Sequence, residues 1–243
     1  MLANENLNKT QVNIETGNFP YAPDFDDLYF LYSTIRKDCV ISILEFGSGW
    51  STLAMSIGLL ENKQLFGTDY KLKNPNPFQL MTIDASQMWM SVALGRLNDE
   101  LKEIVIAIVS APKISEYRGS MVSFFQDVAF FVPDLIYLDG PDIDQVEGDF
   151  GSFYFDKVDG LPMAGDLLRL ENYLLPWTTI ITDGRRANAK LLESMFRRNW
   201  QNMHDPFGDH TLFRLDENPL GPQSEKHIQF RLDHSRSFRL KIK

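Results

Sequence analysis

A turn with the sequence LEFGSGWST carries the residues best suited to bind a small ligand. Gly47 and Gly49 allow backbone angles that other residues resist, and they let a ligand approach the main chain. Ser51 or Thr52 can cap a following helix, whose free amides would then face a carboxylate or phosphate. Glu45 is a carboxylate at the end of an apolar run, where it is costly unless it binds an amine, a water or an amide. The turn therefore indicates a cofactor-binding loop.

A second acid is expected beside this turn, at the end of the next strand. Asp84 ends the apolar run LMTID and directly precedes a predicted helix. Asp69, in LFGTDY, is the competing candidate, because it lies nearer the usual spacing of about 20 residues after the glycines of a dinucleotide-binding turn. Asp69, however, leads into the loop KLKNPNP, whose prolines force extended backbone before them. We therefore favour Asp84.

Two further strand ends carry Asp-Gly pairs, Asp139 in DLIYLDGPD and Asp183 in TIITDGR. Ligands of open α/β sheets bind outside the carboxyl ends of the strands, although Asp-Gly is also ordinary turn chemistry. Asp139 could accept a proton from a substrate. We predict Asp139 as a catalytic residue.

Basic residues follow the second of these acids. Arg185 and Arg186 come directly after the Asp183 turn, and guanidinium groups suit carboxylates and phosphates. We predict Asp183, Arg185 and Arg186 as substrate-binding residues; the alternative is surface pairing with Glu193 or Asp183. His210, in FGDHTLF, precedes a strand and is a second candidate for a catalytic base.

Apolar runs and helical periodicities alternate along the chain. Uniform apolar runs are typical of strands covered on both sides, and alternation with helices predicts a parallel sheet. We expect an α/β, Rossmann-like doubly wound fold, with a mostly parallel sheet and helices on both faces. The predicted helices are 24–37, 51–60, 85–97, 164–175 and 187–200, the predicted strands are 40–46, 80–84, 104–109, 134–138 and 178–182, the late strand candidates are 212–215, 228–232 and 238–242, and 62–78 is expected to be an insertion.

The chain divides into an N-terminal arm (1–23), a main domain (24–220) and a basic extension (221–243) expected to pack on that domain. The net charge of −9 makes nucleic acid an unfavourable partner. The basic run of the extension is expected to be a solvated edge. From Lys226 onward, its charged residues are Lys226, Arg231, Arg236, Arg239, Lys241 and Lys243 against Asp233.

Several absences bear on location. The first twenty residues lack the apolar core of a signal peptide, and no run approaches the roughly 18 uninterrupted apolar residues of a membrane span. The lone Cys39 cannot form an intramolecular disulfide and is expected to be buried. We expect a cytoplasmic protein without membrane contact.

The motifs EFGSGxST, TIDAS, YLDGPD and DGRxANA together resemble the class I S-adenosylmethionine-dependent methyltransferases, over roughly residues 24–215. The resemblance implies that the glycine turn packs under the methionine part of the cofactor. It also implies that the acid of the second strand holds the ribose, and that the end of the third strand lies near the adenine. The cofactor-binding residues implied are Glu45, Gly47, Ser48, Gly49, Ser51, Thr52, Asp84, Ala85, Ser110, Ala111 and Asp139.

The resemblance also bears on the metal and on the reaction. Metal-dependent O-methyltransferases carry ligands where Asp139 and Asp183 stand, so the resemblance implies this pair as candidate metal ligands, although Gly184 replaces the further acid or amide of that pattern. Two carboxylates with water could hold Mg²⁺, and Asp142 and Asp144 could contribute. The expected function is S-adenosylmethionine-dependent methylation of a small-molecule or sugar-type acceptor, with oxygen as the methylated atom. The alternatives are an NAD- or nucleotide-binding protein, against which Thr52 in place of a third small residue argues, and a non-catalytic module of the same fold.

The aromatic run of residues 124–131 could line a pocket or a homodimer face. Aromatic residues in such a run are more often ordinary core, and we expect core here. The run contains Phe124, Phe125, Phe130 and Phe131.

Overall fold

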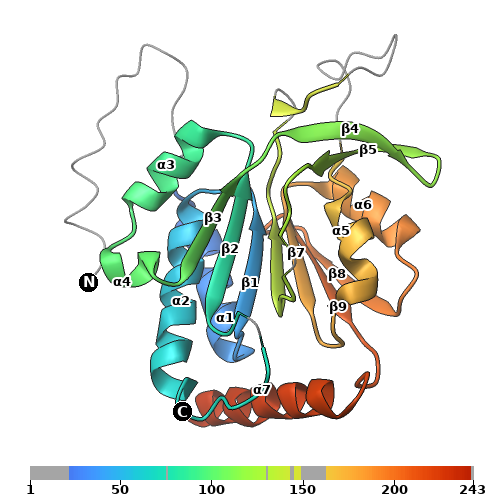
Figure 1. The fold of residues 1–243 in the computed structure, drawn as a ribbon. Coiled ribbons are helices and arrows are strands. Elements are labelled where there is room, and N and C mark those ends of the chain that lie inside the picture. The colour runs from blue at the N-terminus through green and yellow to red at the C-terminus, as the bar shows by residue number, and fades with distance from the viewer. Residues whose placement is uncertain (1–21, 75, 130, 143–144, 149–162, 242–243) are drawn as a thin grey trace.

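The computed structural model describes residues 22–74, 76–129, 131–142, 145–148 and 163–241. A seven-stranded sheet with the order β3-β2-β1-β6-β7-β9-β8 forms its centre (Figure 1). The sheet strands are β1 (Ser42–Phe46), β2 (Gln79–Asp84), β3 (Val105–Val109), β6 (Leu135–Leu138), β7 (Thr179–Asp183), β8 (Trp200–Asp205) and β9 (His210–Leu215). The five strands from β3 to β7 are parallel, and β9 runs antiparallel to both of its neighbours. The expected mostly parallel, doubly wound sheet is confirmed.

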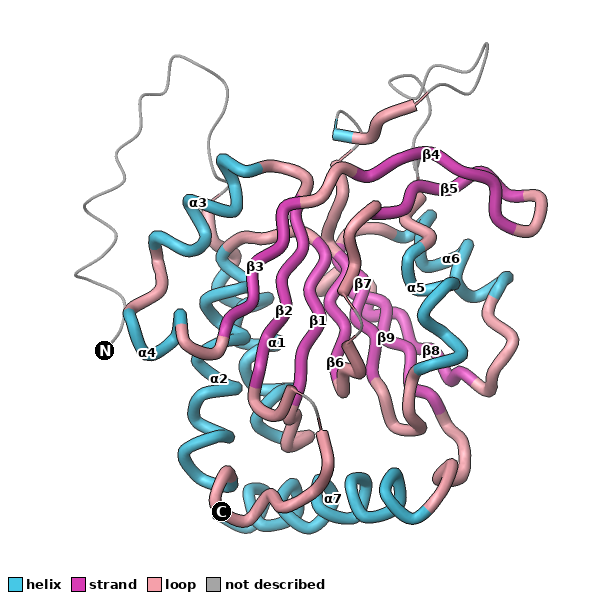
Figure 2. The backbone as a smooth tube through the Cα atoms, in the orientation of Figure 1, coloured by secondary structure: helices cyan, strands magenta, loops and turns pink. Residues whose placement is uncertain are grey.

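Helices cover both faces of the sheet (Figure 2). The helices are α1 (Phe25–Lys37), α2 (Trp50–Phe66), α3 (Gln87–Gly95), α4 (Asp99–Lys102), α5 (Asp166–Leu170), a 3-10 turn η4 (Glu171–Tyr173), α6 (Arg186–Met195) and α7 (Pro222–Lys241). Neighbouring strand residues point to opposite faces: Ile43 packs in the cluster of α1 and α2, whereas Leu44 packs in the cluster of α5 and α6. Both faces are therefore apolar, as the uniform apolar runs predicted.

Helix α2 is longer than the predicted helix 51–60 and includes part of the segment taken as an insertion. The prediction of a helix to residue 200 is wrong. The backbone turns extended at Phe196, and Arg198 points inward, where it donates to the carbonyl of Glu171 and to the carboxylate of Glu217. Strand β8 then begins at Trp200. Its mostly polar residues gave no strand signal in the sequence.

A two-stranded hairpin, β4 (Pro112–Tyr117) and β5 (Ser120–Phe125), was also missed by the sequence interpretation. Its two-residue loop, Arg118 and Gly119, has positive φ at both positions, which is the geometry of a type I′ turn. The hairpin helps to bury the aromatic run, since Phe124, Phe125 and Phe131 are at most 3% exposed. The expectation of core is confirmed for these three, and Phe130 lies outside the described residues.

Helix α7 replaces the two strands predicted at 228–232 and 238–242, which is a second error; Ile242 itself lies outside the described residues. The buried residues Ser224, His227, Ile228 and Arg231 follow the spacing of one helix face. Because most of them are polar, hydrophobic periodicity did not indicate a helix. Within the described part of the chain, no helix has the length and apolar character needed to cross a bilayer.

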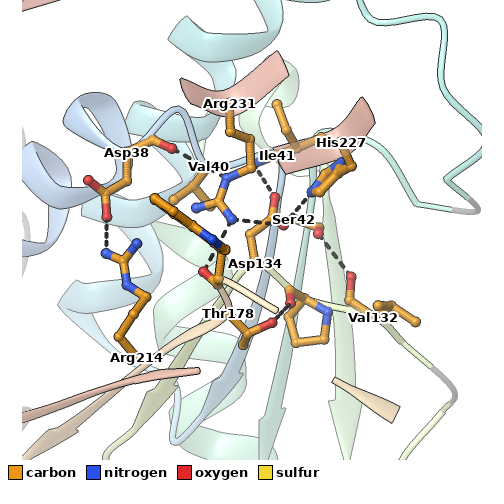
Figure 3. A network of polar contacts seen from close by, with 12 residues as sticks. Asp38, Val40, Ile41, Ser42, Val132, Asp134, Thr178, Arg214, His227 and Arg231 are labelled. Carbon is orange, nitrogen blue, oxygen red and sulfur yellow. Dashed lines mark hydrogen bonds and ion pairs between the residues drawn. The ribbon is translucent and has the colours of Figure 1, made fainter. Parts of the chain in front are cut away.

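Helix α7 crosses the amino end of the sheet, where it meets a buried acid (Figures 1 and 3). Asp134 is 3% exposed; one of its oxygens lies 2.6 Å from Nε2 of His227 and 3.3 Å from Nη1 of Arg231. The other oxygen accepts from the amide of Ile41 at 2.9 Å. Burial opposes ionisation, but Arg231 and His227 outweigh it and hold the pKa of Asp134 well below its usual range. Arg231 is therefore a buried partner, and the expectation of a wholly solvated basic run is wrong for this residue.

Replacing Arg231→Met should destabilise the protein, because it leaves the carboxylate of Asp134 buried without its strongest partner. The expected loss in unfolding free energy is about 3–5 kcal/mol by urea unfolding at neutral pH. Lys226→Met, at an exposed position of the same helix, is the matched control. In the wild type, the contribution of Asp134 is present above about pH 4 and lost as the pH falls through the lowered pKa. Equal unfolding free energies for the two variants would contradict this role.

Candidate functional site

The glycine turn after β1 touches the turn after β6 through backbone alone. Gly47 has φ +94°, and a Cβ added there would lie 2.8 Å from the backbone nitrogen of Gly140. A Cβ added at Gly140 would lie 2.8 Å from Cα of Gly47. The amide of Asp139 also donates to the carbonyl of Phe46 at 2.9 Å. Both positions therefore require glycine. Their contact brings Asp139 to the edge formed by the carboxyl ends of the parallel strands (the rim), where the turn also lies.

Gly49 differs from Gly47. Its backbone is extended, with φ −175°, and an added Cβ would approach only Oγ of Ser51, at 3.9 Å. Its amide donates to Oγ1 of Thr52 at 3.0 Å, which caps the start of α2. The space beside Gly49 is open to a ligand, so its small size is not needed for packing.

Glu45 lies beneath the turn and is fully buried. Its two oxygens accept hydrogen bonds from Oγ of Ser51 at 2.6 Å and from Oγ1 of Thr52 at 2.7 Å. Burial raises the pKa of Glu45 to about 7, although these hydroxyls and that of Thr82 favour the charged form. The structure thus places Glu45, Ser51 and Thr52 together, where they fix the first turn of α2 to β1.

Asp84 ends β2 directly beside the glycine turn. Its Oδ2 accepts from the amide of Ser48 at 2.7 Å and from the Ser48 hydroxyl at 2.6 Å, while Oδ1 accepts from the amide of Ser86 at 2.7 Å. Asp69, the competing acid, is exposed in the loop between α2 and β2, at the amino end of the strands. The structure therefore joins Asp84 to the turn and places Asp69 away from it.

The residues that follow Asp84 and β3 continue this rim. The amide of Ser110 donates to the carbonyl of Asp84 at 3.0 Å, so Ser110 lies beside the second-strand acid. Its hydroxyl accepts from the amide of Asp127 at 2.8 Å. Ala85 leads into α3, and Ala111 leads into the hairpin. The predicted cofactor-binding residues thus lie along neighbouring strand ends.

Asp139 faces an arginine from the next strand end. Nη2 of Arg185 donates to the backbone carbonyl of Asp139 at 2.6 Å, and Nε lies 4.0 Å from Oδ1 of its carboxylate. Nη1 of Arg185 donates to the carbonyl of Pro141 at 2.9 Å. Much of this guanidinium is therefore engaged by the chain itself. Arg186, predicted with it as a substrate ligand, contacts His204.

The Asp139 carboxyl is held in an environment that opposes ionisation. Its pKa is raised above the ordinary value, first because the surrounding chain removes solvent and then because the Asp183 carboxylate repels it, whereas Arg185 opposes the shift. Its side chain is 49% exposed, so water screens part of this effect and ligands can reach the group. An accessible carboxyl with a raised pKa is suited to proton transfer near neutral pH.

Asp183 faces a different group. One of its oxygens accepts from the hydroxyl of buried Tyr137 at 2.5 Å, and the other lies 3.4 Å from Nε2 of His210. The same nitrogen is 3.5 Å from Oδ1 of Asp27 in α1. The pKa of Asp27 is raised, mainly by loss of solvent. Sequence reasoning missed Asp27 and Tyr137, because they lie inside the predicted helix 24–37 and the predicted strand 134–138, away from the strand-end motifs.

A separate hollow of about 420 Å³ lies near the opposite end of the sheet. Its lining includes Tyr70, Leu72, Val132, Leu220 and His227. Ligands of open α/β sheets bind at the carboxyl ends of the strands, and the predicted acids meet there. The rim is therefore the stronger candidate for chemistry.

No family model matches the sequence, and a search of curated proteins gave no relative. Solved structures do resemble this one. The S-adenosylhomocysteine-bound methyltransferase PaMTH1 of Podospora anserina has a TM-score of 0.50 at 15% identity, with 81% of this chain and 80% of that chain covered. The chain shares its fold.

Two further structures are similar by weaker scores. A methyltransferase from Geobacter sulfurreducens has a TM-score of 0.47 at 15% identity, covering 83% of this chain and 82% of that chain. The O-methyltransferase TomG of Streptomyces achromogenes, solved with S-adenosylmethionine, has a TM-score of 0.45 at 13% identity, covering 81% and 82%. At these identities the comparison concerns fold, and the function must be argued from the rim.

The burial of Glu45 predicts a specific pH dependence of stability. Because its folded pKa, about 7, exceeds the unfolded value of about 4.3, its contribution to stability is present below that value and is lost as the pH rises to 7. Glu45→Gln cannot ionise. From pH 4.5 to pH 7.5, the unfolding free energy of Glu45→Gln should therefore rise relative to that of the wild type by up to about 3 kcal/mol, as measured by urea unfolding. Glu103→Gln, at an exposed position, should run parallel to the wild type. A parallel profile for Glu45→Gln would show that Glu45 has an ordinary pKa.

Proposed function

We propose that the protein is an S-adenosylmethionine-dependent methyltransferase that methylates an oxygen of a small-molecule or sugar-type acceptor. One observation carries this proposal. Ser48, in the glycine turn between β1 and α2, binds Asp84 at the end of β2 through both its amide and its hydroxyl. This contact joins the turn to the second-strand acid, which supports the single cofactor site that the resemblance in sequence implies. The shared fold with a methyltransferase supports the same assignment.

The residues present fit this cofactor. The open space beside Gly49 leaves room for its methionine part, and the amides at the start of α2 can face its carboxylate. Asp84 accepts three hydrogen bonds, and an ionised carboxyl has about four acceptor positions. One position is left for a ribose hydroxyl, and a second becomes available if the Ser48 hydroxyl turns away. Ser110 and Ala111 would flank the adenine.

When bound, the cofactor supplies an electrophilic methyl group, and the protein must place the acceptor oxygen in line with it. Asp139 is the carboxyl of this rim that is both accessible and close to the glycine turn. We assign it the removal of the proton from the acceptor hydroxyl. His210 is 2% exposed, so it is poorly placed for that step. Asp183 and Arg186 remain the proposed acceptor contacts, whereas Arg185 orients the Asp139 turn.

A magnesium ion held by Asp139 and Asp183 fits the described residues less well. Oδ1 of Asp139 faces Arg185, while the two oxygens of Asp183 face Tyr137 and His210. Among the described residues, the group of donors close enough to share an ion contains Asp183 but not Asp139, and Asp144 lies outside those residues. The proposed reaction therefore uses no step through magnesium.

Isothermal titration with S-adenosylhomocysteine tests the cofactor assignment. The wild type should bind, and Asp84→Asn should bind at least about tenfold more weakly, because hydrogen bonds to a charged group contribute about 1.5–3 kcal/mol. Asp69→Asn is the matched control and should leave the affinity unchanged. Absence of binding by the wild type, together with thermal stabilisation by NADH, would favour a dinucleotide-binding protein instead. Equal weakening by both variants would remove Asp84 from the cofactor site.

If Asp139 removes the acceptor proton, its substitution should lower the rate of methyl transfer much more than the affinity for the cofactor. In a screen of hydroxyl-bearing acceptors with labelled S-adenosylmethionine, Asp139→Asn should lower the transfer rate by about 10²–10⁴-fold, the usual contribution of general base catalysis. Its affinity for S-adenosylhomocysteine should change far less. Equal losses in both quantities would reassign Asp139 to cofactor binding. Binding without transfer to any acceptor, in the wild type, would point to a non-catalytic protein.

A further inference from the structure

Three side chains from three elements converge beside the rim. Asp183 is the last residue of β7 and pairs directly with His210, the first residue of β9. Asp27 lies in the first turn of α1. One donor atom from each lies within 4.8 Å of the other two. The antiparallel register and the packing of α1 therefore create the cluster, although the three residues are far apart in the sequence.

Nε2 of His210 is the central observation. The residue is 2% exposed, and this nitrogen has no hydrogen-bond partner among the described residues. The carboxylate oxygens of Asp183 and Asp27 lie 3.4 and 3.5 Å away, whereas a charge-assisted N–H···O bond measures about 2.7–2.9 Å. A buried polar atom left unsatisfied is costly, so the arrangement is incomplete as it stands.

The spacing fits donors around a common ion better than it fits a hydrogen bond. Two ligand atoms about 2.1 Å from a metal ion, at the tetrahedral angle, lie about 3.4 Å apart. Both distances from Nε2 match this separation, and donor atoms of Asp27 and Asp183 lie within 4.8 Å of each other. We infer that Asp27, Asp183 and His210 form a binding site for a divalent transition-metal ion of the Zn²⁺ class. Three protein ligands leave a fourth position for water or another oxygen ligand.

The surrounding residues hold the donors in place. The hydroxyl of Tyr137 donates to Oδ2 of Asp183, which leaves Oδ1 directed at His210. Phe30, one helical turn after Asp27, stacks on the His210 ring with centroids 4.7 Å apart. Partners of this kind orient metal ligands and are usually needed for full affinity. The imidazole favours zinc and related ions over Mg²⁺ and Ca²⁺, which prefer oxygen ligands.

This site shares Asp183 with the proposed acceptor contacts but does not include Asp139, and binding of the ion does not depend on methyl transfer. Its donors include neither the glycine turn nor Asp84. An imidazolium shared between the two acids, with no metal, is the competing account of the same cluster. Direct metal titration of the full chain separates the two accounts, and the separate titration with S-adenosylhomocysteine reports on the proposed function.

The full-length protein, freed of metal by chelation, would be titrated calorimetrically with Zn²⁺ and, separately, with Mg²⁺. We expect one Zn²⁺ per chain, and Zn²⁺ bound more tightly than Mg²⁺. His210→Ala should weaken binding by at least about a hundredfold, and Tyr137→Phe by about 10–100-fold. His204→Ala, on the neighbouring strand β8, controls for adventitious binding to surface histidines and should leave the affinity unchanged.

Asp27→Asn keeps the test decisive if His210→Ala fails to fold, since Asp27 lies in the partly exposed first turn of α1. It should lower Zn²⁺ affinity at least about tenfold with a native circular dichroism spectrum. In the wild type, Co²⁺ should give the strong visible absorption of a four-coordinate ion, and this signal should be lost in Asp27→Asn. No Zn²⁺ binding by the wild type, equal affinity in the Asp27 and His204 variants, or preference for Mg²⁺ would overturn the proposal.

Discussion

The contact between Gly47 and Gly140 is the constraint on which the geometry of the rim depends. No side chain can be inserted there, because a single added carbon at either residue would meet backbone at 2.8 Å. The exits of β1 and β6 are therefore held against each other. Through this contact the turn that begins α2 and the carboxyl of Asp139 share one edge of the sheet. Glu45 accepts hydrogen bonds from Ser51 and Thr52, and Asp84 accepts from Ser48. Hydrogen bonds within the chain therefore position the rim before any ligand binds.

Strand β6 has an acid at each end, and the two acids have opposite environments. Asp134, at the amino end, is buried but meets Arg231 and His227, and its pKa is lowered. Asp139, at the carboxyl end, has a half-exposed side chain, but loss of solvent and then repulsion by the Asp183 carboxylate raise its pKa. The same residue type thus serves as a structural anion at one end of a four-residue strand and as a candidate proton acceptor at the other. Neighbouring charges decide between these roles.

The parts of the fold that depend on hydrophobic patterning could be predicted. Uniform apolar runs indicated β1, β2, β3, β6 and β7, and the glycine turn and Asp84 followed from them. The errors arose where polar contacts between distant segments decide the structure. Helix α7 packs through His227 and Arg231, which leave no apolar period in the sequence. Asp27 and His210 are separated by 183 positions in the sequence, and the packing of α1 against β9 brings them together. Local propensity cannot report such contacts.

The position of Asp134 has a consequence for biosynthesis. Its partners follow it by 93 and 97 residues in the sequence. While the chain is being made, β6 leaves the ribosome long before either cation exists, so the acid must stay in water until α7 has been synthesised. The amino end of the sheet consequently closes only after α7 has been synthesised. A chain that stops before His227 would leave the Asp134 carboxylate with neither cation and this end of the sheet without α7.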